Sequence, residues 1–351
     1  MTVTLAERVE AFIRRPEDGD FSTLAREVFS FQFARLEAYS RMCERAGLTP
    51  ETVADWRQIP MIPTRAFKRM EIGSGGAEAV FRSSGTSGEA RSVHAHAFLD
   101  LYRATIETAF ARHCLPGAAP VPMLSLIPSR EQLPDSSLSF MVDHVMATWG
   151  DASNACALGP RGIDGRLLRT WLAARQRDRR PVLVMATAFA LVEALEALAR
   201  LGVRFRLPVG SVLFETGGYK GRSRELSADD LAERTETWFG LAPRRIVREY
   251  GMTELTSQFY SRALSGGDPD LFTAPHWCRY RVLEAESLQE AEAGEAGLIA
   301  IFDLANLGSA VHLLTEDLGV AEPGGLRLLG RADGADLRGC SLSAEELAAG
   351  E

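Results

Sequence analysis

The sequence predicts an α/β fold with a mainly parallel sheet, because short apolar runs alternate with helical stretches along the middle of the chain. Apolar runs of this length are typical of buried strands, and longer stretches with helical character lie around them. Strands separated by helices favour βαβ units, whose strands run parallel. The expected strands are residues 121–127, 181–186, 209–214 and 244–248. The expected helices are residues 98–114, 136–149, 164–177, 189–201 and 228–239.

Two segments of different character flank this core. Residues 1–60 are expected to form a helical N-terminal lead, in which apolar side chains recur at helical spacing over residues 24–39 and Ser22 is a plausible cap. A Pro-rich stretch then leads into the α/β core, residues 61–270. Beyond the core the sequence changes to short β runs with glycine turns, so we expect residues 271–351 to form a β-rich subdomain with a short C-terminal tail. The expected strands of that subdomain are residues 280–283, 297–302, 310–314 and 325–329.

The composition argues against several classes of protein. The chain has 351 residues, of which 39 are basic and 47 acidic, and it contains no basic run, so a nucleic-acid-binding surface is not expected. No apolar stretch is long and uninterrupted enough to span a bilayer, and the N-terminus lacks the pattern of a signal peptide. The five cysteines are scattered and form no close pair, which favours reduced thiols in the cytoplasm over a disulfide frame or a zinc site.

A loop rich in serine, threonine and glycine follows the apolar run that ends at Phe81. Residues 83–88 read Ser-Ser-Gly-Thr-Ser-Gly. Such a loop can surround phosphate oxygens with backbone N–H groups and hydroxyl donors. It is not a P-loop, because residues 89–91 replace the Lys-Ser/Thr pair that would follow the second glycine. Taken alone, the pattern also fits a solvated turn.

A second motif, residues 249–254, reads Glu-Tyr-Gly-Met-Thr-Glu and ends a strand-like run. Its last residue, Glu254, supplies a carboxylate, which is the usual hard ligand for Mg²⁺. The alternatives are that Glu254 is a helix-start carboxylate favoured by the helix dipole and that Tyr250 is a strand-end aromatic in the core.

Together with three further motifs, these segments resemble the acyl-protein synthetase (LuxE-type) family of bacterial luminescence. That family is a branch of the adenylate-forming enzymes related to phenylacetate–CoA ligase. The resemblance covers nearly the whole chain and implies the fold of the adenylate-forming N-terminal domain. The three further motifs are residues 216–221 (Thr-Gly-Gly-Tyr-Lys-Gly), 314–319 (Leu-Thr-Glu-Asp-Leu-Gly) and 330–333 (Gly-Arg-Ala-Asp).

The resemblance implies a site for ATP and Mg²⁺. The serine and threonine loop would hold the β- and γ-phosphates, the two glycines and the tyrosine would contact the adenine, and Asp317 would accept from the ribose hydroxyls with Arg331 in support. Glu254, with Thr86, would hold Mg²⁺. The nucleotide-binding residues implied in this way are Ser83, Ser84, Thr86, Ser87, Gly217, Gly218, Tyr250, Gly251, Thr253, Asp317 and Arg331. The alternative interpretations are that Asp317 is a turn residue and that Arg331 is a surface charge.

The chain departs from the larger superfamily at its C-terminal end. Most adenylate-forming enzymes carry a mobile C-terminal domain with a catalytic lysine, whereas only 18 residues follow Asp333 here and none is lysine. The chain has two lysines, Lys68 and Lys220. Lys220, beside the nucleotide glycines, is the better internal candidate for a phosphate-directed cation, and a partner subunit is the alternative source.

The short tail carries Cys340, and the resemblance implies that this thiol takes the acyl group from the adenylate. A thiolate attacks an acyl-adenylate readily, and the flanking glycine gives mobility. The alternative is an inert thiol in a frayed tail. The resemblance also places the helix over residues 136–149 at the acyl pocket, with Phe140, His144 and Trp149 as candidates for contact with the acid, although the pattern equally describes a core-packing helix. His94 and His96 alternate on a possible strand, where a structural role is favoured over metal binding.

These features lead to one expected function and two alternatives. The chain is expected to be an ATP-dependent ligase that adenylates a carboxylic acid, forms a thioester on Cys340 and passes the acyl group to a partner, either a reductase or a carrier protein. One alternative makes a CoA or carrier-protein thioester directly from the adenylate. The other is a catalytically silent scaffold, which the missing C-terminal domain favours and the complete set of motif residues opposes.

Overall fold

The computed structural model describes residues 3–84, 90–217 and 227–332, and its contacts divide the chain into two compact units. Unit 1 comprises residues 1–108, 252–258 and 273–351, and unit 2 comprises residues 109–251 and 259–272. These units cut across the three consecutive segments expected from the sequence, whose boundaries stay a prediction. Residues 1–108 group with the C-terminal strands because β1 (Ile62–Pro63) pairs with β15 (His312–Glu322) and because Gln32 bonds to the backbone of Asn306.

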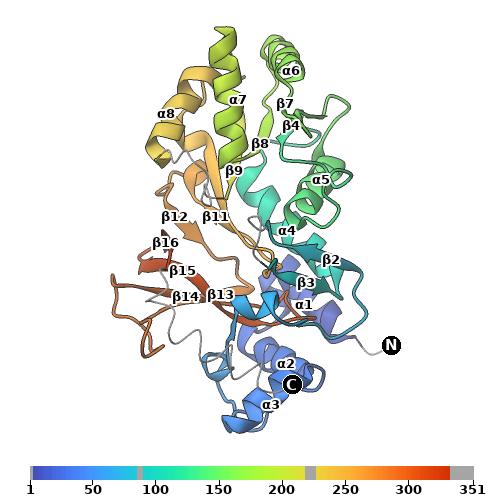
Figure 1. Cartoon of the computed structure of the whole chain (residues 1–351), viewed down its shortest axis with the longest axis vertical. Coiled ribbons are helices and arrows are strands. Elements are labelled where there is room, and N and C mark those ends of the chain that lie inside the picture. The colour runs from blue at the N-terminus through green and yellow to red at the C-terminus, as the bar shows by residue number, and fades with distance from the viewer. Residues whose placement is uncertain (1–2, 85–89, 218–226, 333–351) are drawn as a thin grey trace. The chain divides into compact units, whose positions relative to one another are not determined.

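Unit 2 contains the parallel sheet that the sequence predicts. Neighbouring strands β4, β8, β9 and β10 run parallel, β5 is parallel to β4, and β11 is antiparallel to β10 (Figure 1). The strand bounds are β4 Met123–Leu126, β5 Ala155–Cys156, β8 Leu183–Thr187, β9 Val212–Thr216, β10 Ile246–Tyr250, β11 Phe259–Ser261 and β12 Leu271–Thr273, with a small hairpin of β6 Leu158–Gly159 and β7 Gly162–Ile163. The predicted α/β class is confirmed.

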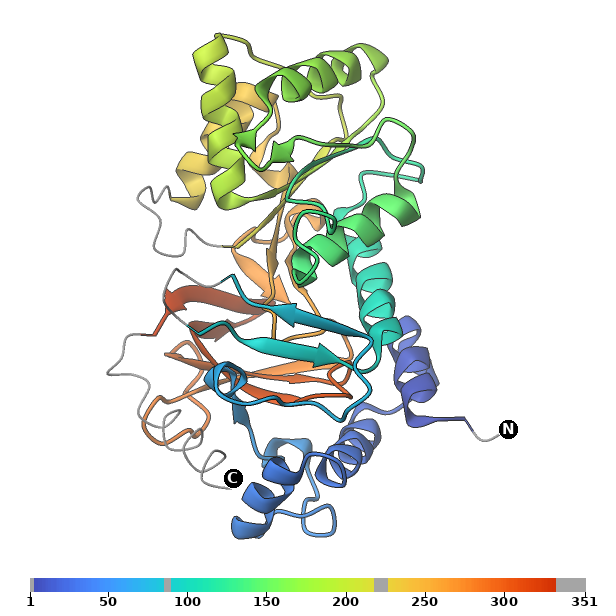
Figure 2. The same ribbon diagram turned by 45° about the vertical axis from the view of Figure 1, so that its right-hand side comes forward.

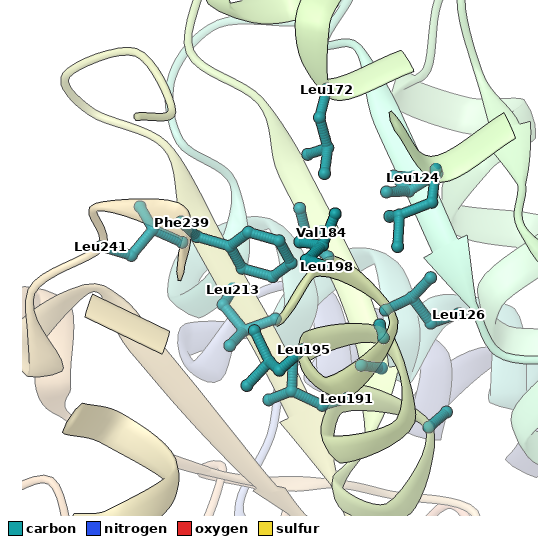
Figure 3. Packing of buried hydrophobic residues seen from close by; sticks show 14 of the residues in the cluster. Leu124, Leu126, Leu172, Val184, Leu191, Leu195, Leu198, Leu213, Phe239 and Leu241 are labelled. Atoms are coloured by element: carbon teal, nitrogen blue, oxygen red, sulfur yellow. The ribbon is translucent and has the colours of Figure 1, made fainter. Parts of the chain in front are cut away.

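Helices cover both faces of this sheet (Figure 2). Leu213 and Phe214 are successive residues of β9 and therefore point to opposite faces. Leu213 belongs to a buried cluster with α6, α7 and α8, which also contains Val184 (Figure 3). Phe214 instead contacts Phe110 of α4, which stacks on Trp149 of α5. The helix bounds are α4 Leu99–Cys114, α5 Ser137–Trp149, α6 Gly165–Asp178, α7 Ala188–Leu201 and α8 Ala228–Phe239.

The helices begin where their sequences supply caps. Asp164 accepts N–H bonds from the first turn of α6, and Thr187 and Ser227 do the same for α7 and α8. Ser136 caps α5. Each cap satisfies an N–H group that has no partner inside its helix, which explains why the helix starts agree so closely with the sequence expectation.

Unit 1 is built on antiparallel strands β13 to β16, with β1 added parallel to β15. Leu283, Leu298, Ala300 and Leu314 form one buried cluster of this unit. A separate antiparallel hairpin, β2 with β3, carries the predicted phosphate loop. The bounds are β1 Ile62–Pro63, β2 Ala79–Arg82, β3 Val93–His96, β13 Cys278–Leu283, β14 Ala296–Asp303, β15 His312–Glu322 and β16 Gly325–Arg331.

The N-terminal lead is helical, but its cap differs from the expectation. The side chain of Asp20, not of Ser22, accepts the N–H of Thr23 and caps α2, because the capping residue must precede the first turn. The backbone carbonyl of Ser22 instead accepts a bond from Arg26. The bounds are α1 Leu5–Arg14, α2 Phe21–Phe33 and α3 Glu37–Arg45, with 3₁₀ turns at Pro16–Asp18 and Trp56–Gln58. Outside the lead, 3₁₀ turns lie at Thr64–Lys68, Pro243–Arg245 and Ala263–Ser265.

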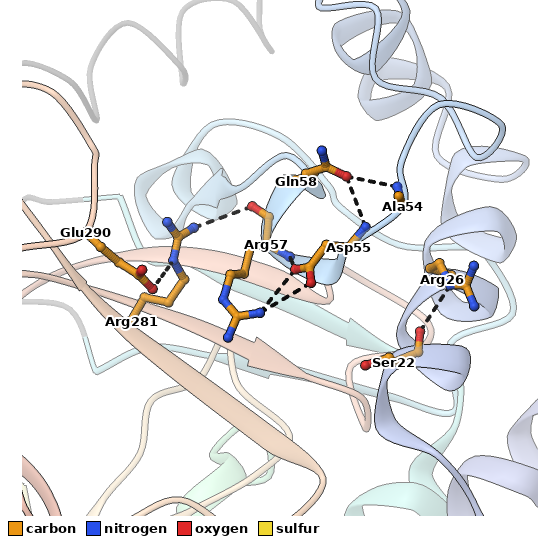
Figure 4. Close-up of polar contacts among 8 residues, drawn as sticks. All are labelled: Ser22, Arg26, Ala54, Asp55, Arg57, Gln58, Arg281 and Glu290. Carbon is orange, nitrogen blue, oxygen red and sulfur yellow. Dashed lines mark hydrogen bonds and ion pairs between the residues drawn. The ribbon is translucent and has the colours of Figure 1, made fainter.

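Polar contacts join this lead to the β strands of unit 1 (Figure 4). Asp55 and Gln58 form a reciprocal capping pair around the turn Trp56–Gln58. Arg281 of β13 donates to the carbonyl of Arg57 at 3.4 Å and pairs with Glu290 at 3.1 Å. The lead therefore packs as part of unit 1.

Candidate functional site

The predicted phosphate loop begins in unit 1 at the end of the β2–β3 hairpin, where hydrogen bonds still join the two sides of the hairpin. Ser83 lies one residue beyond β2, where its N–H donates to the carbonyl of Ser92 at 3.0 Å and its hydroxyl accepts the N–H of Ser92 at 2.9 Å. Arg91 donates to the carbonyl of Ser83 at 2.5 Å. Ser84 is exposed. The structure thus places Ser83 and Ser84 at the start of the loop, next to the hairpin. Thr86 and Ser87 lie outside the described residues.

The segment that carries Thr253 and Glu254 has no regular secondary structure. No helix begins at Glu254, which removes the helix-start explanation of this carboxylate. Glu254 is 8% exposed, so an acidic residue is held in a largely buried position. The Thr253 carbonyl oxygen lies 2.7 Å from Nδ1 of His94, and the Glu254 carbonyl accepts from Nδ2 of Asn306 at 2.9 Å.

The two residues implied in ribose binding lie opposite each other in unit 1. Asp317 of β15 is in register with Arg331 of β16, and Arg331 Nε lies 3.3 Å from Asp317 Oδ1. Arg331 also donates to Glu316 at 3.2 Å, and Arg65 lies 3.5 Å from the other oxygen of Glu316. The arginine side chain is 64% exposed, whereas the Asp317 side chain is 17% exposed. The structure therefore brings Asp317 and Arg331 together.

Polar residues gather at the carboxyl ends of β9 and β10 in unit 2. Thr216 contacts the carboxylate of Glu249 directly. Gly217 adopts a φ of +75°, a conformation that favours glycine. A Cβ atom on Gly251 would lie 2.2 Å from Oε1 of Glu249, so a larger residue there would require the carboxylate of Glu249 to shift. Ligands of open α/β sheets bind outside the carboxyl ends of such strands.

The ring of Tyr250 is largely buried in unit 2. It makes edge-on contacts with Phe259 at 6.1 Å and Phe272 at 6.2 Å between ring centroids. These contacts match the core-aromatic alternative for this residue and hold the ring at the end of β10.

Sequence reasoning did not single out Glu215, the residue before Thr216. Its side chain is buried, and burial raises the pKa of its carboxyl to about 7, although the nearby charge of Arg248 lowers the pKa in part. Arg248 Nε lies 3.7 Å from Glu215, and the same guanidinium contacts Asp270. An acidic residue near the end of an otherwise apolar strand was the available signal.

The three predicted acyl-pocket residues lie on α5 in unit 2 and do not form one contacting group. Phe140 and His144 stack with ring centroids 6.3 Å apart, and Arg130 lies over the Phe140 ring. Trp149 instead stacks on Phe110 at 6.1 Å. Two of the three residues therefore pack against each other, and the third packs against α4.

Neither Cys340 nor Lys220 lies among the described residues, and the same holds for Gly218. Lys68 is exposed at the end of its 3₁₀ turn. Cys278, the nearest rival to Cys340 on sequence grounds, is buried and contacts Asp303, and burial raises the pKa of its thiol well above the ordinary value. Burial likewise raises the pKa of Cys43 to about 12 and that of Cys114 well above normal. These three thiols are poor nucleophiles.

Within residues 3–84, 90–217 and 227–332, no three His, Cys, Asp or Glu side chains gather as a metal site would require. None of the helices described there combines the length and apolar character needed to cross a bilayer.

Residues 165–348 match the family model described as acyl-protein synthetase, LuxE. The chain is also 21% identical, over 336 residues, to the long-chain-fatty-acid–luciferin-component ligase of Vibrio harveyi. That alignment covers 92% of this chain and 86% of the Vibrio protein.

Solved structures of adenylate-forming ligases share the fold. An open conformation of 2-hydroxyisobutyryl-CoA ligase, in complex with its acyl-AMP and CoA, superposes with a TM-score of 0.64 at 17% identity, covering 93% of this chain and 75% of that one. An ATP-bound RpMatB–BxBclM chimera gives a TM-score of 0.50 at 17% identity, covering 73% and 49% of the two chains. At these identities the superpositions show the fold alone.

Proposed function

Because the chain belongs to the acyl-protein synthetase (LuxE) family and is an AMP-forming ligase, we propose that it converts a carboxylic acid into an acyl-adenylate and then passes the acyl group through Cys340 to a partner protein. The observation that carries the proposal is the family match over residues 165–348. That stretch includes Glu254, Asp317 and Arg331, and the structure keeps the first largely buried and the other two paired.

The proposed chemistry has three steps. In the first, a carboxylate oxygen of the acid attacks the α-phosphorus of ATP, and pyrophosphate leaves with the electrons of the broken P–O bond. In the second, the thiolate of Cys340 attacks the acyl carbon, and AMP leaves. In the third, a nucleophile of the partner protein attacks the thioester carbon, and the thiolate of Cys340 leaves. The first step accumulates negative charge at the phosphates, so it requires cations and oriented donors.

We assign the nucleotide contacts residue by residue. Ser83, Ser84, Thr86 and Ser87 would donate to the β- and γ-phosphates, and Lys220 would supply positive charge near them. Asp317 would accept from both ribose hydroxyls while Arg331 holds its carboxylate in place. The adenine would contact Gly217, Gly218 and Tyr250.

The donor set also fits Mg²⁺. Glu254 offers a carboxylate and Thr86 a hydroxyl, both hard oxygen ligands of the kind that Mg²⁺ binds alongside water and phosphate oxygens. When bound, Mg²⁺ would neutralise charge on the departing pyrophosphate. In this proposal the carboxylate of Glu254 would hold the ion, and the backbone of residues 253–256 would fix where that carboxylate lies.

Pyrophosphate exchange into ATP tests the first step. The purified protein, given Mg²⁺ and a panel of fatty and aryl acids, should exchange labelled pyrophosphate into ATP with at least one acid. Glu254→Gln should lower that exchange by about a hundredfold, because losing a metal ligand weakens charge stabilisation at the phosphates. Glu233→Gln, an exposed change on α8, is the control and should leave the rate unchanged. Full exchange in Glu254→Gln would remove this residue from the mechanism.

A direct acyl-CoA ligase is the second candidate function. Its basis is the shared fold alone, because a ligase crystallised with CoA superposes over 93% of this chain. The two functions differ in the acceptor of the acyl group, so thioester accumulation on CoA, without acylation of the protein, would select the CoA ligase.

A further inference from the structure

The segment of residues 253–257 has its backbone held by buried side chains that come from distant parts of unit 1. His94 Nδ1 bonds the carbonyl of Thr253 at 2.7 Å, and Asn306 Nδ2 donates to the carbonyl of Glu254 at 2.9 Å. Thr105 Oγ1 donates to the carbonyl of Thr256 at 2.9 Å. All three donors are at most 1% exposed. The carbonyl of Glu254 and those of two close neighbours are therefore satisfied by side chains rather than by a helix or sheet.

Two N–H groups of the same segment are held by one carboxylate. Asp303 accepts from the N–H of Thr256 at 3.1 Å and from that of Ser257 at 2.9 Å. It also accepts the Ser257 hydroxyl at 2.7 Å, and that hydroxyl in turn accepts from Trp277 at 2.8 Å. Asp303 ends β14, so the loop is tied to the antiparallel strands of unit 1.

The donors themselves are fixed by further contacts. Asn306 Nδ2 also donates to the carbonyl of Ala310, and the carbonyl of Asn306 accepts from Gln32 at 2.8 Å. Thr105 lies on α4, and its one hydroxyl hydrogen is shared between the carbonyl of Thr256 and that of Tyr102 at 2.8 Å. Because these donors are themselves held in place by other contacts, they fix the position of the backbone segment that they bind.

His94 connects two of the predicted nucleotide motifs. It lies on β3 directly opposite Phe81 of β2, and Ser83 follows two residues after Phe81. The hairpin that carries the phosphate loop therefore reaches the backbone of Thr253 through one imidazole. Burial lowers the pKa of His94 to about 4, so the ring is neutral near pH 7, and a carbonyl partner requires the proton on Nδ1.

We propose that His94, Thr105 and Asn306 are positioning residues that fix the backbone of residues 253–256 and so place Glu254 relative to the hairpin of β2 and β3 for binding of MgATP. The inference rests on the proposed function, because it gives Glu254 its role. It adds that the affinity for MgATP depends on three donors that do not touch the nucleotide.

Paired substitutions separate positioning from packing. His94→Phe keeps a ring but removes the donor, whereas His94→Asn replaces Nδ1 by an amide N–H at a similar place. Thr105→Val removes only the hydroxyl, and Thr105→Ser retains it. His312→Phe is the matched control for the histidine, because His312 is equally buried, has its pKa lowered to about 4 and bonds the carbonyl of Ile59 at 2.7 Å.

The matched control for Thr105→Val is Thr235→Val. Thr235 is fully buried on α8, and its hydroxyl donates to the carbonyl of Leu231 at 2.7 Å, away from the segment of residues 253–257.

Two measurements are needed: the Kd of MgATP by calorimetry, and the rate of pyrophosphate exchange as a function of Mg²⁺. We expect His94→Phe and Thr105→Val to weaken MgATP binding and raise the half-saturating Mg²⁺ concentration by about tenfold. His94→Asn and Thr105→Ser should recover most of the loss. The two control variants should keep the wild-type Kd even if they lower the free energy of unfolding by a similar amount.

The outcomes distinguish this inference from the proposed function. If wild-type protein binds no MgATP, both fall together. If it binds MgATP but exchanges no pyrophosphate with any acid, the proposed function fails and the Kd values still decide the inference. If His94→Phe and Thr105→Val bind MgATP as the controls do, or if the retained-donor variants are as impaired as the others, the positioning role is wrong. Should His94→Phe fail to fold, the Thr105 pair decides the question.

Discussion

Two regions that carry predicted motif residues are held by different kinds of interaction. In unit 1, the segment of residues 253–257 is fixed by a neutral imidazole, a hydroxyl, an amide and one deeply buried carboxylate. In unit 2, at the ends of β9 and β10, the guanidinium of Arg248 lies against the carboxylates of Glu215 and Asp270, while the carboxylate of Glu249 contacts Thr216. The first region depends on hydrogen-bond geometry, and the second depends on the balance between charge and burial.

This difference gives the two regions opposite responses to pH. The folded-state pKa of His94 is about 4, below its ordinary 6.5, so the stability that it contributes is present above pH 6.5 and is lost as the pH falls toward 4. The folded-state pKa of Glu215 is about 7, above its ordinary 4.5. Its contribution is therefore full below pH 4.5 and is lost as the pH rises through 7. Near neutral pH, the contribution of His94 to stability therefore stays constant, whereas the contribution of Glu215 at the strand ends of unit 2 changes with pH.

The largest expected effect comes from the carboxylate in unit 1. Asp303→Asn should lower the free energy of unfolding by about 3 kcal/mol, because an amide group would face buried N–H and O–H donors that need an acceptor. Urea unfolding followed by tryptophan fluorescence measures this. Asp270→Asn, at a half-exposed ion pair, is the control and should cost less than about 1 kcal/mol. Equal losses in the two variants would contradict the distinction between the regions.

The second effect concerns Glu215. The free energy of unfolding of Glu215→Gln, minus that of wild type, should rise by about 2 kcal/mol as the pH is raised from 5 to 8. The reason is that glutamine cannot ionise in this buried position. The measurement is a series of urea unfolding curves across that pH range. A difference between the two proteins that does not change with pH would show that Glu215 ionises normally in the folded state.

The smallest effect on stability is expected at the exposed arginine of the ribose pair. Arg331→Gln should change the free energy of unfolding by less than about 1 kcal/mol, since its ion pair with Asp317 is open to solvent. Its MgATP affinity should nevertheless fall by about tenfold if Arg331 holds Asp317 for the ribose. Calorimetry would decide this, and an unchanged Kd would reduce Arg331 to a surface charge.

Much of the fold was predictable because local signals and packing agree. The helices that begin after Asp164, Thr187 and Ser227 start at residues whose side chains cap them, and the buried strands appear as short apolar runs. The cap at Ser22 was wrong because two capping residues lie close together and only Asp20 precedes the first turn.

The candidate site was predictable only where motifs are local. The loop after β2 and the pair Asp317 and Arg331 could be found from short sequence patterns. The donors at His94, Thr105 and Asn306 could not, because each lies at least 52 residues from the carbonyl that it binds and none belongs to a motif. Glu215 was missed because its raised pKa comes from burial by other segments, which a local pattern does not encode.

Acylation of Cys340 tests the central claim most directly. After incubation with ATP, Mg²⁺ and an acid that supports pyrophosphate exchange, intact-protein mass spectrometry and peptide mapping should find one hydroxylamine-labile acyl group, located on Cys340. Cys340→Ser should lose that group and keep pyrophosphate exchange, whereas Cys156→Ser, at a partly buried thiol that bonds backbone carbonyls, should keep both. An acyl label that persists in Cys340→Ser, or acyl-CoA formation with no labelled protein, would contradict the account.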